Sequence, residues 1–308
     1  MIWLTFRQHR AQLAATGALL LALGAMFLVS GLEAARYAAE HAGLPPGELA
    51  AALGDRYQAV YTVFGWMPIV APALIGAFWG APLLAGEFER GTNKLVWTQS
   101  VPPGRWLAVK LSLLSLAAAA GGLLLSAMVS AWRSVFDRDD VFGNIGVFNM
   151  VGVAPAAWWL FAFTVGVAAG AFLRRTLPAM AVVVAVLAVV TFGLFRLSEH
   201  YAEPARIVAA DRSVLEHDVR LVGQAWLDPA GREIAVPPPG ACPRPAGGGE
   251  RAQLEYERCL LAKGYRHVLY VHGPERFWRF QWTEASILLL ASAGLTAAAV
   301  HRTLRRRV

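Results

Sequence analysis

Six apolar runs, each close to the length of a membrane crossing, constrain the fold of this chain more than any other feature. An α-helix needs about 20 apolar residues to cross the hydrocarbon core of a bilayer. Backbone polar groups inside a bilayer must be hydrogen-bonded within the protein, which restricts such runs to helices. The runs cover residues 13–32, 57–78, 106–131, 156–172, 177–195 and 282–300. We therefore expect an all-α polytopic membrane protein with six transmembrane helices.

The composition agrees with a bilayer environment. Apolar residues make up 56% of the 308 residues and charged residues 16%, which is more apolar and less charged than an average soluble domain. The basic residues do not form a stripe interleaved with aromatic residues, so we expect no nucleic-acid partner. The first run follows Arg7 and Arg10 as a signal peptide would, but its apolar stretch is too long, and we expect an uncleaved span.

The charges between the runs predict the orientation. If both chain ends lie on one side of the membrane, that side carries twelve basic and two acidic residues, whereas the two short loops opposite carry four basic and seven acidic residues. The twelve basic residues are Arg7, Arg10, Arg90, Lys94, Arg105, Lys110, Arg174, Arg175, Arg302, Arg305, Arg306 and Arg307. Cytoplasmic loops are enriched in Lys and Arg. We therefore expect both termini in the cytoplasm.

The segment between the fifth and sixth runs, residues 197–281, differs from the rest of the chain. It is far longer than the other connections and contains the Pro/Gly-rich stretch PPPGACPRPAGGGE. We expect a short helical approach from Glu203, then one or two strands around a DPAG turn. A helix that stops at Gly264 and a short strand at 267–271 should follow. The segment is thus expected to be a small α+β extracellular domain that separates residues 1–196 from the last span and basic tail, 282–308.

Both cysteines of the chain, Cys242 and Cys259, lie in this outside segment. In a non-reducing compartment a disulfide is the economical interpretation, and closing so short a loop contributes about 3 kcal/mol. Two free or buried thiols are the alternative. A metal site that combines them with His267 or His272 would lack the paired C-x-x-C spacing, so we expect no metal.

Several kinds of catalytic residue are missing from the sequence. Its three lysines follow Asn93, Val109 and Ala262 instead of Gly, which excludes a P-loop. The spans carry no serine–histidine arrangement and no paired carboxylates for an intramembrane protease. Charged residues are nearly absent from the span centres, which argues against a carrier driven by protons or ions. We expect a chain without catalytic residues or cofactors of its own.

The sequence LLAGEFERGTNKLVWTQS places a compact charged element between the second and third runs. The many Gly and Pro residues of the second run predict a kinked helix packed against a partner helix. Gly91 can adopt the left-handed conformation that stops a helix, and Thr92 can cap a short helix over 93–100. We expect a stiff cytoplasmic hairpin over 83–104. A solvated loop that only obeys the charge rule is the alternative, and interfacial snorkelling alone would explain Arg105 and Lys110.

The stretch APLLAGEFERGTNKLVWTQSVPPGRWLAVKL resembles the corresponding loop of type-2 ABC exporter permeases. The matching positions are Glu87, Glu89, Gly91, Thr92, Pro102, Arg105 and Lys110. YRHVLYVHGPERFWRFQWTEASILLLASAGL is also similar to the end of bacterial members that carry an outside domain before the sixth span. The chain departs from these permeases in its very short amphipathic lead, residues 1–10.

This resemblance implies a function and a set of partners. In such permeases the loop is a coupling helix that docks on a separately encoded ATP-binding subunit, and two permeases and two ATPases form the exporter. ATP and Mg would be bound by the partner, and the location would be the bacterial plasma membrane. The implied coupling residues are Glu87, Phe88, Glu89, Arg90, Gly91, Thr92, Leu95, Val96 and Trp97.

The translocation pathway is expected at the interface of two permeases, where the second and fifth spans face each other. Its candidate lining residues are Tyr61, Phe64, Phe192 and Phe195. Because no charge lies at membrane depth, we expect a hydrophobic or amphipathic cargo such as a drug, a modified peptide or a lipid. A different class remains as the alternative: a membrane-anchored sensor or assembly protein whose extracellular domain binds a ligand or partner.

Overall fold

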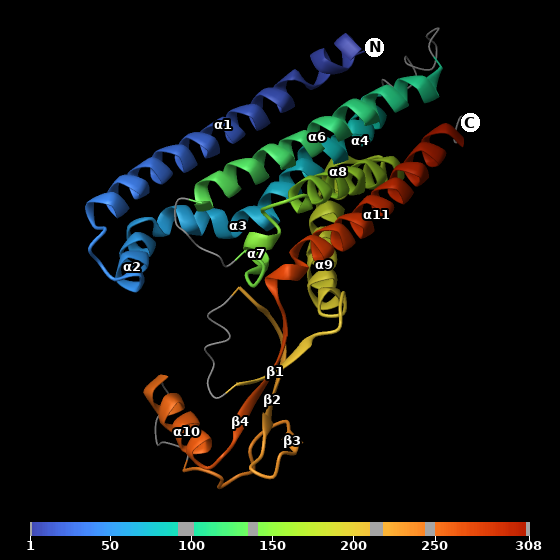
Figure 1. Ribbon diagram of the computed structural model, residues 1–308. Coiled ribbons are helices and arrows are strands. Elements are labelled where there is room, and N and C mark those ends of the chain that lie inside the picture. The colour runs from blue at the N-terminus through green and yellow to red at the C-terminus, as the bar shows by residue number, and fades with distance from the viewer. Residues whose placement is uncertain (1, 92–101, 135–140, 210–217, 244–249, 306–308) are drawn as a thin grey trace. The chain divides into compact units, whose positions relative to one another are not determined.

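The computed structural model of the chain describes residues 2–91, 102–134, 141–209, 218–243 and 250–305 (Figure 1). The chain divides into two compact units. The first, called here the helical unit, contains Met1–Arg138, Gly146–Arg196 and Gln281–Val308. The second, the sheet unit, contains Asp139–Ile145 and Leu197–Phe280.

Six helical segments of the described residues are long and apolar enough to cross a membrane. Each run identified in the sequence maps onto one of them, which confirms the expected polytopic helical fold. The segments are Phe6–Glu40, Gln58–Glu89, Gly104–Arg133, Ala154–Leu173, Thr176–Ser198 and Pro274–Arg305. The strands of the described chain lie between the fifth and sixth segments, as expected for a small α+β region there.

The first span belongs to α1 (Ile2–Glu40), a single helix of 39 residues. The short lead that precedes the apolar run is therefore the beginning of this helix, with no break between them. A short helix, α2 (Pro46–Arg56), follows. Tyr57 separates it from α3 (Gln58–Ile75). Tyr57 packs with Ala34 of α1 and Leu53 of α2 in a small buried cluster.

The second span changes its helical geometry part-way along. It consists of α3, the π-helical turn η1 (Gly76–Gly80) and α4 (Ala81–Glu89). The second span is therefore irregular, as expected, and the irregularity is a widened helical turn at the glycines. Pro68 and Pro72 lie before it, inside α3. Single π-helical turns are rare within α-helices and frequently occur at functional sites.

The close approach of α8 (Ala154–Leu173) explains the glycines of this turn. A Cβ atom on Gly80 would lie 2.3 Å from the carbonyl oxygen of Phe163, and one on Gly166 would lie 2.2 Å from that of Gly76. Gly170 faces the backbone of Ala81 in the same way, at 2.6 Å. The four glycines, at positions 76, 80, 166 and 170, form what we call the glycine seam. Small residues allow membrane helices to pack backbone against backbone in this manner.

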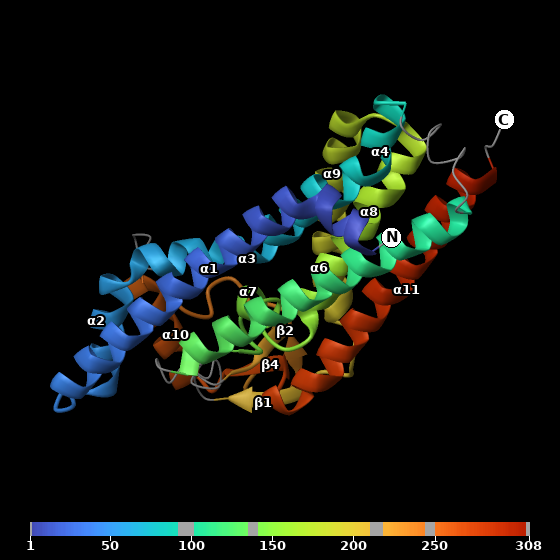
Figure 2. The same cartoon turned by 90° about the horizontal axis from the view of Figure 1, so that it is seen from above.

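The other helices surround α8, which is buried along nearly its whole length. They are α6 (Pro103–Arg133), α7 (Ile145–Phe148), α9 (Thr176–Ser198) and α11 (Phe277–Arg305). α6 packs against both α1 and α8 (Figures 1 and 2). On α11, the amide oxygen of Gln281 accepts hydrogen bonds from the N–H groups of Val153 and Ala154, which begin α8, at 3.1 and 2.9 Å.

Several helix ends meet at one end of the helical unit, which we call the hairpin end. The last turn of α4 contacts α6 and the beginning of α9 through side-chain hydrogen bonds. The Arg302 guanidinium on α11 lies 5.4 Å from the ring of Phe172 near the end of α8. The beginning of α1 lies toward the same end (Figures 1 and 2). The structure therefore brings the end of α4, the first arm of the expected hairpin, against other spans. The second arm, expected over 93–100, lies outside the described residues.

Within the described residues of the sheet unit, four antiparallel strands form a sheet in the order β1-β4-β2-β3. They are β1 (Ala205–Ala209), β2 (Arg220–Leu227), β3 (Glu233–Ile234) and β4 (Arg266–His272), and α10 (Glu250–Ala262) precedes β4. The DPAG turn joins β2 to β3, with the Gly231 N–H donating to the Asp228 carbonyl at 2.9 Å. Gly264, with φ +88°, follows α10 as expected.

The expected helical approach at the beginning of this segment is wrong. The described part of that stretch, Ala205–Ala209, is the strand β1, which pairs with β4 from Ala205 opposite Val271 to Ala209 opposite His267. The alternation of side chains in five residues is too short to distinguish a helix from a strand. Pairing with a strand some 60 residues away decides the conformation, and local sequence carries no signal for it.

The interior of the sheet unit contains a buried arginine. The Arg220 guanidinium lies 4.7 Å from the ring of Phe142 and 5.4 Å from the ring of Phe280, and its Nη2 donates to the Phe142 carbonyl at 3.1 Å. The Asp218 carboxylate accepts hydrogen bonds from the N–H groups of Phe142 and Gly143. Residues from before α8 are thereby held against β2.

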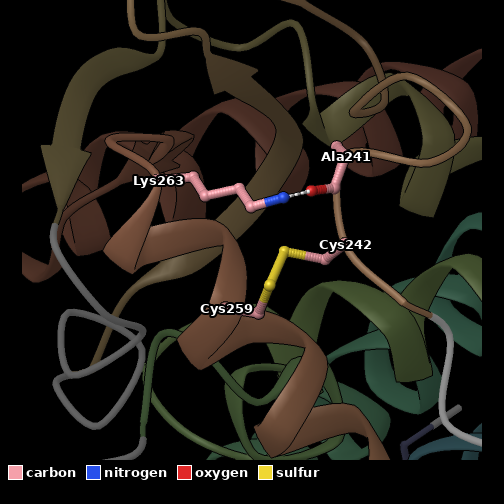
Figure 3. The surroundings of a disulfide bond; sticks show 4 residues. All are labelled: Ala241, Cys242, Cys259 and Lys263. Carbon is pink, nitrogen blue, oxygen red and sulfur yellow. Dashed lines mark hydrogen bonds between the residues drawn. A yellow bond between two sulfur atoms is a disulfide. The ribbon is translucent and has the colours of Figure 1, made fainter.

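A disulfide joins Cys242 to Cys259, with the two Cα atoms 6.1 Å apart (Figure 3). Cys259 lies on α10, and Cys242 lies on the loop that follows β3. One turn further along the helix, the Lys263 ammonium donates a hydrogen bond to the Ala241 carbonyl (Figure 3). The Pro/Gly-rich loop is therefore fastened to α10 at two adjacent points.

Candidate coupling site

The last turn of α4 makes side-chain contacts with several other elements at the hairpin end. Three consecutive residues, Glu87, Phe88 and Glu89, each contact a different element of the helical unit. Because 100° separates neighbouring side chains on a helix, three successive residues point in three directions. The family resemblance implies a coupling role for these positions, which stays a prediction, and the structure shows what each of them contacts within the chain.

Glu87 forms a buried ion pair with Lys110 of α6. The Lys110 Nζ lies 2.9 Å from the Glu87 Oε1, and the lysine side chain is 2% exposed. The ammonium also lies 4.4 Å from the centre of the Trp106 ring, a cation–π contact. Snorkelling therefore does not describe Lys110, whereas Arg105 is exposed. Losing one partner of such a pair leaves a buried charge without compensation, which costs about 3–5 kcal/mol.

Glu89 binds the beginning of α9. Its carboxylate accepts hydrogen bonds from the Thr176 N–H at 2.9 Å and from the Thr176 hydroxyl at 2.6 Å. The first N–H groups of a helix have no partner within the helix, and the helix dipole favours a negative charge there. Glu89 therefore caps α9 from a separate span, and a movement of α4 would pull on the end of α9.

Phe88 contacts the turn between α8 and α9. Its ring lies 4.9 Å from the guanidinium carbon of Arg174. Arg174 is the residue that ends α8, in the left-handed conformation with φ 56°, and its N–H donates to the Gly170 carbonyl at 3.0 Å. The same turn is thus held by Phe88 on one side and by the Glu89 cap at Thr176 on the other.

The structure confirms the helix stop at Gly91. The Gly91 φ is +67°, and its N–H donates to the Phe88 carbonyl at 3.2 Å. The Arg90 N–H donates to the Gly86 carbonyl four residues back, whereas the Gly91 bond reaches back only three residues and tightens the last turn. Arg90 and Gly91 are exposed. Four further coupling residues, Thr92, Leu95, Val96 and Trp97, lie outside the described residues, and their roles stay predictions.

A set of polar contacts between α1 and the second span escaped the sequence analysis. The His9 Nδ1 lies 2.5 Å from the Gln12 Oε1, and the Gln12 amide donates to the Phe78 carbonyl at 2.8 Å. The Trp79 indole N–H donates to the Thr16 hydroxyl at 3.0 Å. The signal was present, because polar residues at positions 9, 12 and 16 recur at helical spacing on one face of the helix.

The four expected pathway residues lie in two different environments. Tyr61 and Phe64 pack around Trp132 of α6, with ring centroids 5.3 and 6.0 Å from it. Phe192 and Phe195 are exposed on α9. A role for them at an interface between two permeases stays a prediction. In the part of the chain that the structure describes, no three His, Cys, Asp or Glu side chains are grouped so as to hold a metal ion.

Comparison with known families agrees with this architecture. Residues 11–197 match the family described as ABC-2 membrane transporter related. The chain belongs to this family. The match covers more than half of the sequence and includes the hairpin end, which confirms the resemblance seen in residues 81–111. No curated protein and no solved structure matched the chain.

Family membership supports the broad classification of the chain. Members of the ABC-2 family are typically non-catalytic transmembrane subunits that associate with an ABC ATPase. The six apolar segments and the family together make this chain a multi-pass membrane protein of the transporter class. Within this family member, Glu87, Phe88 and Glu89 contact α6, the α8–α9 turn and the beginning of α9.

Proposed function

We propose that this chain is the permease subunit of an ATP-driven exporter that moves a hydrophobic or amphipathic cargo out of the cell. Two such permeases, identical or similar, would pair with two copies of a separate ABC ATPase. The observation that supports the proposal most is the last turn of α4, where three consecutive residues contact α6, the α8–α9 turn and the beginning of α9.

These contacts give a route for mechanical coupling. A buried ion pair cannot be opened without exposing a charge to an apolar environment, so α6 should follow α4 when the hairpin moves. The glycine seam joins the second span to α8 without intervening side chains, so α8 should follow as well. ATP binding would close the partner subunits, displace the two hairpins and shift the permease between inward-open and outward-open states.

The proposed orientation places the hairpin end in the cytoplasm. Arg90, Arg105, Arg174 and Arg175 all lie there, as the positive-inside rule requires of a cytoplasmic surface. α9 has 23 residues and is therefore about 35 Å long, enough to cross the hydrocarbon core. The chain segment between α9 and α11 would then be extracellular, where a disulfide is stable, and the location would be the plasma membrane of a bacterium.

The cargo proposal follows from the apolar character of the spans. Glu284 of α11 is a buried carboxylate within a spanning segment, and it accepts a hydrogen bond from the Trp158 indole at 2.8 Å. This hydrogen bond joins α11 to α8 and engages one oxygen of the carboxylate. The described spans therefore favour a cargo without a compact charge, such as a drug, a modified peptide or a lipid.

The experiment that tests the proposal is reconstitution with an ABC ATPase encoded next to this chain. Both proteins would be expressed together, purified through the permease and placed in nanodiscs, and ATP hydrolysis would be measured with and without the permease. Glu89→Ala should abolish permease-stimulated hydrolysis, while thermal unfolding of the purified chain verifies folding. Failure to form a complex would refute the permease assignment and favour a sensor or assembly protein.

Thr176→Val separates two routes of coupling. This variant removes the hydroxyl that binds Glu89 and leaves Glu89 itself in place. If it reduces stimulation as strongly as Glu89→Ala, coupling passes through the cap of α9. If stimulation falls only in Glu89→Ala, the hydroxyl is dispensable, and coupling uses the Thr176 N–H bond that the variant keeps or a direct contact between the carboxylate and the ATPase. Normal stimulation in both variants would contradict the assignment of this turn as the coupling site.

A further inference from the structure

An apolar groove of about 560 Å³ lies between α1 and the second span, within the helical unit. This volume falls in the range of about 300–1,000 Å³ typical of small-molecule sites. The wall from α1 consists of Ala11, Gln12, Ala15, Thr16, Leu19, Leu20 and Leu23. The opposite wall comes from the second span between Ala71 and Pro82, and Leu125, Trp159 and Met180 complete the lining.

The groove is long and follows the helix axis. Its lining residues on α1 run from Ala11 to Leu23, and at 1.5 Å per residue they extend about 18 Å along the helix. They recur every three or four positions, so they form one face of α1. A site this long and lined almost entirely by aliphatic and aromatic side chains fits an extended hydrocarbon chain better than a compact ligand.

The groove opens sideways, toward the surroundings of the helical unit. Leu19 and Phe78, which line it, are 47% and 55% exposed. Its polar lining groups are already engaged, since Gln12 donates to the Phe78 carbonyl and Thr16 accepts from the Trp79 indole. In a spanning segment, an exposed apolar surface faces lipid. A lipid acyl chain can therefore enter from the bilayer without displacing a polar contact.

Positive charge lies at the end of the groove nearest the beginning of α1. Arg7 is one helical turn before Ala11, the lining residue at the edge of this face, and lies about 40° around the helix from it. Its guanidinium lies 5.1 Å from the ring of Trp3. Arg7 and Trp3 are exposed, as expected of residues at the headgroup level. Along α1 the first acidic residue is Glu33, more than six turns away, and Glu87, which acts electrostatically on nearby His9, is paired with Lys110. A negatively charged group would complement this position.

We propose that the groove binds one acyl chain of an anionic phospholipid, with the lipid phosphate at Arg7. Such a lipid fills the space between α1 and the second span, so it would hold the two helices together. The inference requires that the chain lies in a membrane, and it does not depend on ATP-driven export.

Native mass spectrometry of the full chain in detergent tests the proposal, with an equimolar mixture of phosphatidylglycerol and phosphatidylcholine as the probe. The unsubstituted chain should retain one phosphatidylglycerol. Ala15→Phe fills the groove and should lose the bound lipid, whereas Ala14→Phe, on the opposite face of α1 and outside the lining, should keep it. Arg7→Gln should reduce the preference for phosphatidylglycerol about fivefold, the effect of one juxtamembrane cation. Arg10→Gln, on the far side of the helix, should reduce it less.

Three results would overturn the proposal. The first is equal lipid retention by Ala15→Phe and Ala14→Phe, and the second is an unchanged lipid preference in Arg7→Gln. The third is dissociation of a dimer by Ala15→Phe without any change in lipid binding, which would show that a second copy of the chain occupies the groove. Thermal unfolding shows whether Ala15→Phe is folded. If that variant is unfolded, the comparison of Arg7→Gln with Arg10→Gln decides.

Discussion

Replacing Gly80 by alanine should force the second span away from α8. The new Cβ atom would lie 2.3 Å from the Phe163 carbonyl oxygen and 3.0 Å from the Gly166 Cα. Both are backbone atoms, so no side chain can rotate out of the way. Ordinary contacts begin near 3.4 Å, which means that the two helices must separate by about 1 Å.

The loss of packing between the separated helices sets how much Gly80→Ala lowers the free energy of unfolding. A gap of about 0.5–1 Å forfeits a quarter to a half of the dispersion energy between facing atoms, and overpacking of this kind costs about 1–3 kcal/mol. Because the seam joins two spans along four glycines, we expect Gly80→Ala to lower the free energy of unfolding by about 2–3 kcal/mol, the upper end of this range. Gly166→Ala should have a similar effect, since its Cβ would lie 2.2 Å from the Gly76 carbonyl oxygen.

The assay is thermal unfolding of the full chain in detergent, followed by circular dichroism. Gly80→Ala should lower the midpoint by about 3–5 °C. Gly65→Ala is the matched control, because a Cβ there meets no atom within 4 Å and removing a helical glycine stabilises by about 0.5–1 kcal/mol. The double variant Gly80→Ala/Gly166→Ala should lose less than the sum of the two, since both open the same seam. Equal midpoints for Gly80→Ala and Gly65→Ala would refute the reasoning.

Three further predictions concern other contacts. Mass spectrometry of non-reduced peptides should find Cys242 joined to Cys259, and Cys259→Ser should lower the free energy of unfolding by about 3 kcal/mol; two alkylatable thiols would contradict this. Burial lowers the pKa of His272 from 6.5, so the folded chain binds fewer protons than the unfolded chain just below that pH. Hydrogen-exchange protection of β4, corrected for intrinsic rates, should therefore decrease as the pH falls below about 6.5, but not in His272→Asn. Gln281→Leu removes the acceptor for two N–H groups of α8 and should lower the unfolding midpoint, whereas Gln281→Glu keeps that acceptor and should lower it less.

Local sequence was sufficient to predict the spans, because their length and apolar character are set by the bilayer. It was less reliable for the helix ends: α1 extends from Ile2 to Glu40, well beyond its apolar run, since polar residues near the surface remain helical. The stop at Gly91 was predictable because a left-handed residue after a helix favours glycine. The conformation of β1 was not, because its partner β4 lies far away in the sequence.

The long-range polar contacts were the main part of the site that sequence analysis missed. It identified Glu87 and Lys110 separately, by their match to a family pattern, but nothing local showed that they bind each other across 23 positions. Gln281 contacts the beginning of α8, 127 positions away. In each case a polar residue at the edge of an apolar run was visible, and only the packing of the helices reveals its partner.

The Glu87–Lys110 pair has a consequence for how such chains diverge. Neutralising either member alone strands the other charge in an apolar setting, whereas exchanging both for apolar residues of similar volume is often nearly neutral. Substitution at one position should therefore be tolerated only together with substitution at the other. In a homologue that has lost the glutamate, we expect the lysine to be gone as well, so the two positions should be inherited as a unit.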